Sequence, residues 1–324
     1  MNWTDYQLID SGGQEKLERF GKYLLARPEP QAVWSKSLSD DEWEKRASGW
    51  YHRSKGQGSP GFRTGENDPA GKQTEQIAEG RWSINPGMAE QWIIQYPLGD
   101  GQIKFRLGLT SFGHICIFPE QASNWEYIYE AVKQAKYRES NQSRQVGKWS
   151  GGAAGAERIR VLNLFAYTGG ASLAAKAAGA DVVHVDSVKP VINWAKENME
   201  LSGMRDIRWV VEDALKFVMR EANRRNLYHG IILDPPAYGR GPKGEKWILE
   251  EGVDELVHLC SSILYPEDSF IVFSLYSLGY SALISENLIK THFRDPENIE
   301  SGELYFSDQA GRKLPLGTFL RMSR

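Results

Sequence analysis

Acidic residues follow two successive strand patterns in the second half of this 324-residue chain, just behind a glycine turn. The run VLNLFAYTGGAS predicts a strand, a turn at Gly169 and Gly170, and the start of a helix. The next strand pattern, VVHV, ends at Asp186, and the third ends at Glu212 and Asp213. The glycine turn lets a ligand approach the backbone. A carboxylate after the second strand can accept hydrogen bonds from ribose hydroxyls, and an acid after the third strand can accept one from an adenine amino group. The turn and the acids, in this order after three successive strands, predict a site for an adenosine-containing ligand.

Two other interpretations compete with this one. Taken singly, a glycine pair is an ordinary turn, and an aspartate after a strand is often a helix cap. A nicotinamide cofactor prefers Gly-x-Gly-x-x-Gly, but Phe165, Tyr167 and Gly170 stand here in a different register. The methionine tail of S-adenosylmethionine needs less backbone clearance than a diphosphate, so the sequence favours S-adenosylmethionine. A nucleotide-binding module or an NAD oxidoreductase stays open as the alternative.

The run IILDPPAYGRG, after the fourth strand pattern, contains the candidate catalytic residues. Methyl transfer is an in-line displacement, so catalysis mainly requires the acceptor lone pair to be positioned opposite the leaving sulfur. The Asp234 carboxylate and the Pro235 carbonyl can accept the N–H donors of an exocyclic amine, and Pro235 with Pro236 keeps the loop stiff. Tyr238 can stack on a planar base. The alternative is a rigid turn with a capping aspartate.

From Arg158 onward, strand and helix patterns alternate along the chain. Continuous apolar strands between helices predict a mostly parallel sheet covered on both faces, in a Rossmann-like, doubly wound α/β fold. The tail ELYFSDQAGRKLPLGTFLRM predicts an antiparallel hairpin at the edge of this sheet. Ligands of such sheets bind at the carboxyl ends of the strands, where the acids are expected.

The first half follows a different pattern, rich in tryptophan and short strands. QWIIQYPL and QIKFRLGL flank Gly99-Asp100-Gly101 and predict a hairpin. HICIF, at 114–118, predicts a strand, NWEYIYEAVKQAKY a helix, and 48–80 a long loop. We therefore expect a β-rich acceptor-recognition domain over 1–111 and the methyltransferase domain over 112–324, with a linker at about 139–157.

Composition excludes several classes of protein. The net charge is −3 and the pI about 6.1, which excludes a strongly basic coat protein. No run is long and apolar enough to span a membrane, and no secretory signal is visible. Two cysteines make no disulfide framework, which predicts a cytoplasmic protein, and six histidines lack metal-ligand spacing, which predicts no metal. The sequence leaves the oligomeric state open.

Basic residues nevertheless gather in three segments. They predict contacts with RNA, and the alternative is that they are solvated surface charges. The first segment interleaves Lys45, Arg46, Arg53, Lys55 and Arg63 with Trp50, Tyr51 and Phe62; the second holds Lys136, Arg138, Arg144, Lys148, Arg158 and Arg160; the third holds Arg240, Lys243 and Lys246.

The cysteines also bear on the acceptor atom. Carbon-5 methylation of cytosine needs a cysteine nucleophile. Cys260 stands at helical spacing from Leu256 and Ile263, which predicts a core position, and Cys116 can face either side of its predicted strand. We therefore predict no covalent cysteine intermediate.

LNLFAYTGGAS, VDS at 185–187, WAKEN at 194–198 and ILDPPAYGRG resemble class I S-adenosylmethionine-dependent methyltransferases. More narrowly, they resemble the group that contains the large-subunit ribosomal-RNA cytosine and guanine methyltransferases. The resemblance implies a seven-stranded sheet with its last strand antiparallel, S-adenosylmethionine as cofactor, and a nucleobase of RNA, favoured to be ribosomal RNA, as acceptor. A small-molecule or protein acceptor stays open.

The resemblance also implies cofactor contacts. The turn would hold the methionine end, Asp186 and Ser187 the ribose, and Asp213 and Ala214 the adenine, while the FPEQ segment would fold over the cofactor. The turn and the FPEQ segment contribute Phe118, Gln121, Asn163, Phe165, Tyr167, Thr168, Gly169 and Gly170. Phe165 and Tyr167 depart from the common motif, which often has glycine there. Ala237 separates Pro236 from the aromatic residue that directly follows Pro-Pro in the amino-methylating motif.

Overall fold

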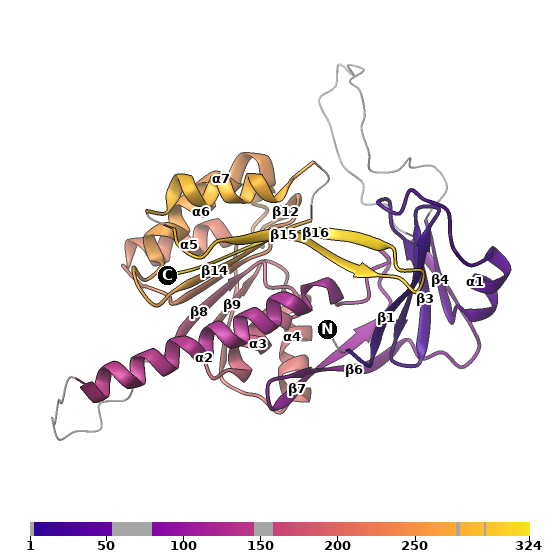
Figure 1. Ribbon diagram of the computed structural model, residues 1–324, viewed down its shortest axis with the longest axis horizontal. Helices are drawn as coiled ribbons and strands as arrows, with labels where there is room; N and C mark the ends of the chain where they lie inside the picture. Colours follow the sequence, from indigo (N-terminus) through magenta and orange to yellow (C-terminus); the bar gives the residue numbers. More distant parts are fainter. Residues whose placement is uncertain (1–2, 54–79, 146–157, 277–278, 295) are drawn as a thin grey trace, which may run out of the picture.

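A seven-stranded sheet forms the centre of the computed structural model, which describes residues 3–53, 80–145, 158–276, 279–294 and 296–324, with the backbone alone for 136–145 (Figure 1). Its strand order is β10-β9-β8-β11-β14-β16-β15. β16 pairs antiparallel with both β14 and β15, whereas the other pairs of the sheet are parallel. The bounds are β8 (Arg160–Leu164), β9 (Asp181–Asp186), β10 (Ile207–Val211), β11 (Gly230–Leu233), β14 (Phe270–Leu275), β15 (Glu300–Ser307) and β16 (Lys313–Ser323). The predicted α/β fold, with its antiparallel last strand, is confirmed.

Helices cover both faces of this sheet, which explains why apolar and polar residues do not alternate along its central strands. Val161 of β8 packs with α2 and α3, whereas the next residue, Leu162, packs with α5 and α6 on the opposite face. All residues of β11 are buried. The helices are α2 (Ala122–Gln145), α3 (Gly170–Ala177) and α4 (Lys189–Leu201) on one side, and α5 (Ala214–Asn223), α6 (Leu249–Ile263) and α7 (Ala282–His292) on the other (Figure 1).

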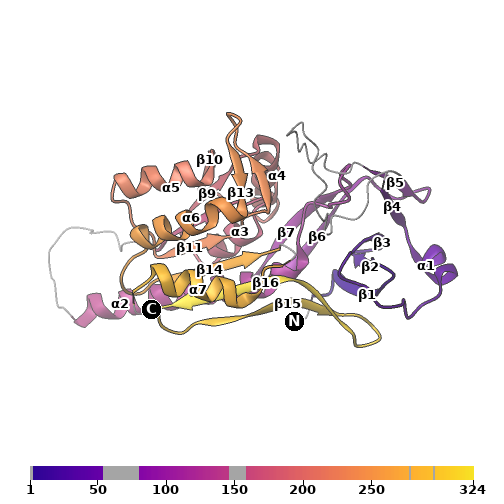
Figure 2. The ribbon, with the colours of Figure 1, turned by 90° about the horizontal axis from the view of Figure 1, so that it is seen from above.

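The N-terminal part contains a five-stranded sheet, which lies beside the α/β sheet (Figure 2). Its strands are β1 (Tyr6–Gly12), β2 (Glu15–Phe20), β3 (Tyr23–Pro28), β4 (Gly49–Arg53) and β5 (Gly80–Ile84). Helix α1 (Asp40–Arg46) begins with a capping box between Ser39 and Glu42. This arrangement agrees with a β-rich N-terminal part.

The predicted hairpin forms as β6 (Gln91–Leu98) and β7 (Gly101–Gly108), with Gly99 at φ 56° in the turn. It packs on α4: the indole N–H of Trp194 donates to the Arg106 carbonyl at 2.7 Å, and the Arg106 N–H donates to Asn198 Oδ1 at 2.8 Å. The hairpin therefore contacts α4, across the boundary predicted after residue 111.

Three local predictions were wrong in part. HICIF forms no strand, because Gly113 and Cys116 adopt positive φ (78° and 67°) and a turn joins Thr110 to His114. The segment predicted as a loop from Ser48 begins with β4, and residues 54–79 lie outside the described residues. Helix α2 continues to Gln145, beyond the predicted start of the linker at Glu139, and residues 146–157 are likewise not described.

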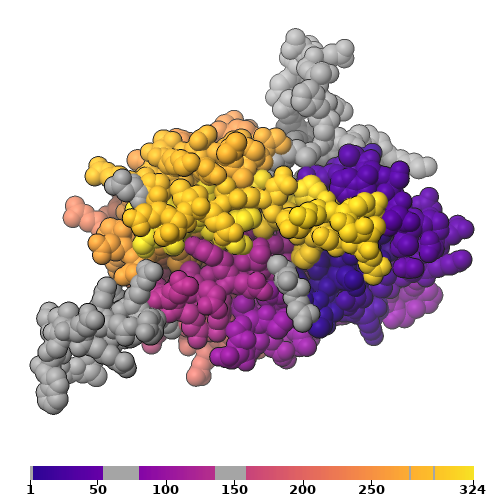
Figure 3. Space-filling model, viewed as in Figure 1, coloured from indigo at the N-terminus to yellow at the C-terminus, as the bar shows by residue number. Residues whose placement is uncertain are grey.

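The C-terminal hairpin β15–β16 extends past the α/β sheet and contacts the N-terminal sheet. The space-filling view shows it as a continuous band between the two parts (Figure 3). At its tip the Gln309 N–H donates to the Ile9 carbonyl at 3.1 Å, and the Ser11 hydroxyl donates to Asp308 at 2.9 Å. Among the described residues, no helix combines the length and apolar character that crossing a bilayer requires.

Candidate active site

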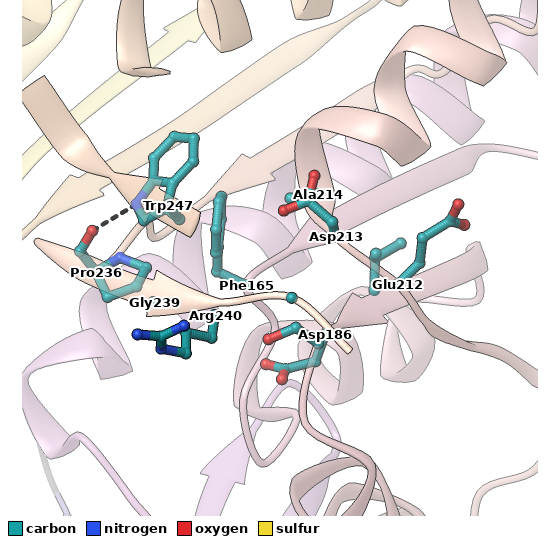
Figure 4. Close-up of a pocket in the computed structure, with 12 residues that line it drawn as sticks. Phe165, Asp186, Glu212, Asp213, Ala214, Pro236, Gly239, Arg240 and Trp247 are labelled. Atoms are coloured by element: carbon teal, nitrogen blue, oxygen red, sulfur yellow. Dashed lines mark hydrogen bonds between the residues drawn. The ribbon is translucent and has the colours of Figure 1, made fainter. Parts of the chain in front are cut away.

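A pocket lies at the carboxyl ends of β8, β9, β10 and β11, where the sequence placed the ligand (Figure 4). It gathers six of the predicted site residues: Phe165, Asp186, Ser187, Asp213, Ala214 and Pro236. The others that line it are Val185, Glu212, Gly239, Arg240, Gly241 and Trp247. Residues from three strand ends therefore meet the loop that follows the fourth.

Two backbone N–H groups fix the carboxylate of Asp186, the residue predicted to contact the ribose. Its Oδ1 accepts from the Val188 N–H and its Oδ2 from the Tyr167 N–H, both at 2.9 Å. Burial raises the pKa of Asp186 above its ordinary value, and these backbone donors act in the opposite direction. A carboxylate oxygen accepts more than one hydrogen bond, so both oxygens can still accept from vicinal hydroxyls.

The acids after β10 each have a local structural role. Asp213 is the N-cap of α5 and accepts from the Lys216 N–H at 3.0 Å, as the capping interpretation expected. Glu212 pairs with Arg220 at 2.5 Å, and its carboxylate points away from Phe165 (Figure 4). Asp213 still lines the pocket beside Ala214, so its predicted contact with adenine stays a prediction.

Asn163, Thr168 and both turn glycines lie outside the pocket lining. The Asn163 amide donates to the Ser172 hydroxyl at 2.9 Å, and the Thr168 hydroxyl donates to the Cys116 carbonyl at 2.7 Å. These polar side chains hold the turn and its neighbouring segments together.

The two glycines are needed for packing as well as for the turn. Gly169 has φ 96°, which requires glycine, and a Cβ there would lie 3.2 Å from the Cβ of Ala195. A Cβ on Gly170 would come within 2.6 Å of the Trp125 ring. Packing against Ala195 and Trp125 is thus a second reason for these glycines, and their predicted role beside a ligand stays a prediction.

The FPEQ segment lies against this turn and against the Asp-Pro-Pro loop. The Phe118 ring is 5.1 Å from that of Tyr167, between centroids, and Tyr167 has φ 48°. Gln121 ends a short 3₁₀ helix (Pro119–Gln121), and its Nε2 donates to Asp234 Oδ2 at 3.4 Å. The structure thus joins the segment to Asp234, a contact that the sequence did not predict.

Asp234 is partly exposed, yet the surrounding protein still raises the pKa of its carboxyl to about 7, and the charge of Glu120 adds to this effect. Glu120 is itself buried, and burial raises its pKa to about 7. Pro235 is buried and Pro236 exposed, whereas Tyr238 is half-buried and outside the pocket lining. A carboxyl with such a pKa exchanges its proton near neutral pH, as a group that handles protons should.

Sequence reasoning missed the hairpin that closes the pocket, formed by β12 (Tyr238–Arg240) and β13 (Lys246–Ile248). The Trp247 indole N–H donates to the Pro236 carbonyl at 2.7 Å, and its ring lies 5.0 Å from the Phe165 ring (Figure 4). The run GPKG between two short segments is a hairpin signal that could have revealed it.

Both cysteines are buried. Cys260 lies in α6 within the core, which confirms its predicted position. Burial raises the pKa of Cys116 to about 11 and raises that of Cys260 as well. Since the thiolate is the nucleophile, these environments disfavour cysteine chemistry.

The first basic segment is only partly a loop. Lys45 and Arg46 end α1, Trp50 packs 6.0 Å from Trp43, and the Tyr51 hydroxyl donates to the Ser111 carbonyl. Trp50 and Tyr51 belong to β4, which corrects the predicted loop at these two positions, whereas the predicted RNA contact of the segment stays a prediction. Lys55, Phe62 and Arg63 lie outside the described residues.

In the second basic segment, Arg160 donates to the Leu227 carbonyl at 2.8 Å and stacks on Tyr228, while Arg158 is exposed. Lys148 and the side chains of Lys136, Arg138 and Arg144 are not described. The predicted RNA contact of this segment therefore stays a prediction.

Comparison with known proteins identifies the chemistry. Residues 141–271 match the model of an S-adenosylmethionine-dependent methyltransferase family. The crystal structure of an S-adenosylmethionine-dependent methyltransferase from Agrobacterium tumefaciens is 34% identical, with a TM-score of 0.79 over 99% of this chain and 91% of that one. The chain belongs to the S-adenosylmethionine-dependent methyltransferases. The cofactor predicted from the strand ends is thereby confirmed, and the oxidoreductase alternative is set aside.

Two curated relatives of this methyltransferase have names that include an acceptor. Ribosomal RNA large subunit methyltransferase K/L of Shewanella frigidimarina is 33% identical over 115 residues, which is 34% of this chain and 16% of the relative. Ribosomal RNA large subunit methyltransferase I of Citrobacter koseri is 30% identical over 125 residues, 38% of this chain and 31% of the relative. The chain spans less than a third of either relative.

Proposed function

We propose that this methyltransferase transfers the methyl group of S-adenosylmethionine to a nucleobase of RNA, with ribosomal RNA as the favoured acceptor. The observation that carries the proposal is the Asp234 carboxyl, which lies in the stiff Asp-Pro-Pro loop behind β11. That loop contributes Pro236 to the pocket that also holds Asp186.

S-adenosylmethionine supplies an electrophilic methyl group, so the protein has to position an acceptor and accept its proton. An exocyclic amine bonds to the methyl carbon as the carbon–sulfur bond breaks, and the nitrogen then loses a proton. The Asp234 carboxylate and the Pro235 carbonyl are suited to accept from such an N–H. The ordinary pKa of Asp234 is raised to about 7, which suits a proton acceptor at neutral pH.

A carbon acceptor that requires a cysteine nucleophile has less support. Both cysteines are buried, and burial raises their pKa values. The resemblance implies that cytosine-directed members carry a cysteine near the end of the fifth strand along the chain. This chain has Ser274 there, which is buried in β14. We therefore favour a nitrogen acceptor.

Ribosomal RNA is favoured because relatives with that name are 30–33% identical to this chain over 115–125 residues. The deciding experiment maps modified nucleotides of ribosomal RNA by mass spectrometry in cells with and without the gene. We expect one nucleotide to lose a methyl group, with restoration by the wild-type gene but not by Asp234→Ala. An unchanged modification profile would contradict the ribosomal-RNA assignment.

Salt dependence separates RNA from a small acceptor. Binding to a ribosomal-RNA fragment should weaken steeply between about 50 and 200 mM salt, because neutralising phosphates releases counterions. Salt-independent binding, or none, would favour a small-molecule or protein acceptor instead.

A further inference from the structure

A series of hydrogen-bonded polar side chains, buried at Arg321 and Asn124 and half-buried at Gln121, connects β16 to Asp234. Arg321 of β16 donates through Nε to Asn124 Oδ1 at 2.9 Å. Asn124, in the first turn of α2, donates through Nδ2 to Gln121 Oε1 at 2.8 Å. Gln121 then donates through Nε2 to Asp234 Oδ2 at 3.4 Å. Asn124 and Arg321 are buried, so water does not replace these partners.

The direction of this chain follows from Arg321, because a guanidinium has only donors. The Arg321 guanidinium must therefore face the oxygen of the Asn124 amide. In that orientation the NH₂ group of Asn124 points toward Gln121. The oxygen of Gln121 then faces Asn124, and its NH₂ group faces Asp234. Rotating either amide by half a turn would set donor against donor or oxygen against carboxylate.

Other contacts hold the two ends of the chain. The Ser274 hydroxyl accepts from Asn124 at 3.1 Å and donates to Gln121 Oε1 at 3.3 Å, which supports the same orientation. Arg321 also donates to Ser123 and Glu300, at 3.0 and 3.2 Å, and stacks on Phe319. The residue that sets the direction is therefore fixed by contacts of its own.

We propose that Arg321 and Asn124 are positioning residues, which hold Gln121 as a hydrogen-bond donor to Asp234 and leave Asp234 Oδ1 for the acceptor. The role of Asp234 toward the acceptor rests on the proposed function, but the donor-to-acceptor direction of the hydrogen bonds from Arg321 to Asp234 does not. Among the described residues, the charged group that acts on Asp234 is Glu120, which in turn faces Lys16, Glu18 and Arg27 of the N-terminal sheet.

The test measures the titration of Asp234 directly, in the full chain without acceptor. The carboxyl carbons of ¹³C-labelled aspartates are followed by NMR against pH, and Asp234→Asn in each background assigns the signal. Asn124→Asp keeps the acceptor for Arg321 but removes the donor to Gln121, whose amide should then rotate. We expect the Asp234 midpoint to rise by about one pH unit, because a donor to a carboxylate favours its ionised form.

Two further variants separate the donor from the added charge. Asn124→Leu combined with Ser274→Ala removes both donors to Gln121 Oε1 without adding charge and should raise the midpoint similarly. Ser123→Asp adds a carboxylate beside Arg321 while retaining Asn124, and should leave the midpoint near that of the wild type. An unchanged midpoint in Asn124→Asp, or equal shifts in Asn124→Asp and Ser123→Asp, would overturn the proposal. Since no acceptor is present, failure of this titration is distinct from failure of the RNA assignment.

Discussion

Two carboxylates at the carboxyl ends of β9 and β11, the strands on either side of β8, have different environments. Asp186 accepts from two backbone N–H groups, which hold it in one orientation. Asp234 accepts from one side-chain amide, and burial raises its pKa to about 7. The first environment suits a fixed ligand contact, and the second suits a group that exchanges protons.

Replacing Asp186 should weaken cofactor binding. We expect Asp186→Ala to lower the affinity for S-adenosylmethionine roughly tenfold or more, because hydrogen bonds to a charged group contribute about 1.5–3 kcal/mol. Calorimetry provides the measurement. Asp181→Ala, at the exposed opposite end of β9, is the matched control and should bind as the wild type does. Equal affinities for the three proteins would refute the assignment of Asp186 to the ribose.

The pKa of Asp234 predicts a pH-dependent stability. Between its ordinary pKa of 3.8 and about 7, the unfolded chain has lost the proton that the folded chain keeps, so the free energy of unfolding falls as pH rises. Asp234→Asn does not titrate, and its stability advantage should therefore grow from pH 4 to 7 and then level off. Thermal unfolding at several pH values measures this, with Asp181→Asn as control. A constant difference would show that the pKa is not raised.

At the scale of elements, the β12–β13 hairpin holds the Asp-Pro-Pro loop through the indole of Trp247. Trp247 is buried, donates to the Pro236 carbonyl and packs on Phe165. Among the described residues, it alone joins the Asp-Pro-Pro loop to the pocket wall by both a hydrogen bond and a ring contact.

We expect Trp247→Phe to keep the ring packing but to lose the hydrogen bond to Pro236. A hydrogen bond contributes about 1 kcal/mol, so the affinity for S-adenosylmethionine should fall several-fold. As a control, Trp82→Phe removes a similar indole hydrogen bond, to the Thr110 carbonyl at 2.8 Å, in the N-terminal part and outside the pocket lining. Calorimetry should show wild-type affinity for that control. Equal losses in both variants would argue against a specific role of the hairpin.

At the scale of the whole molecule, Arg312 joins the C-terminal hairpin to the N-terminal sheet. Its Nη2 donates to Asp10 Oδ1 at 2.6 Å and to the Ser11 carbonyl at 2.8 Å, while Nε donates to Asp308 at 2.9 Å. Asp10 and Asp308 are buried, and Arg312 forms an ion pair with each of them in addition to their neutral hydrogen-bond donors.

We expect Arg312→Met to lower the free energy of unfolding by about 3 kcal/mol, because it leaves buried carboxylates without their counter-charge. Denaturant unfolding measures the loss, and limited proteolysis should cut the N-terminal part faster. Arg205→Met removes an exposed arginine 3.9 Å from Asp206 and should change little. A loss of equal size in both variants would contradict a role for Arg312 in joining the two parts.

Local patterns in the sequence were sufficient for the α/β fold, the β6–β7 hairpin, the core position of Cys260 and the acids at the strand ends. Apolar runs, turn residues and helix caps act over a few residues, so they can be read without the fold. The same patterns misled at 114–118, where buried isoleucines resemble a strand but positive φ at Cys116 prevents one.

Tertiary structure alone decided which distant side chains meet. Gly170 faces Trp125, Trp247 closes the pocket, and Gln121 donates to Asp234, 113 positions along the chain. Such contacts depend on how helices and strands pack. No local sequence pattern indicates that two residues far apart in the chain will be in contact. The sequence by itself therefore determined the chemistry at the strand ends, and packing decided which side chains orient it.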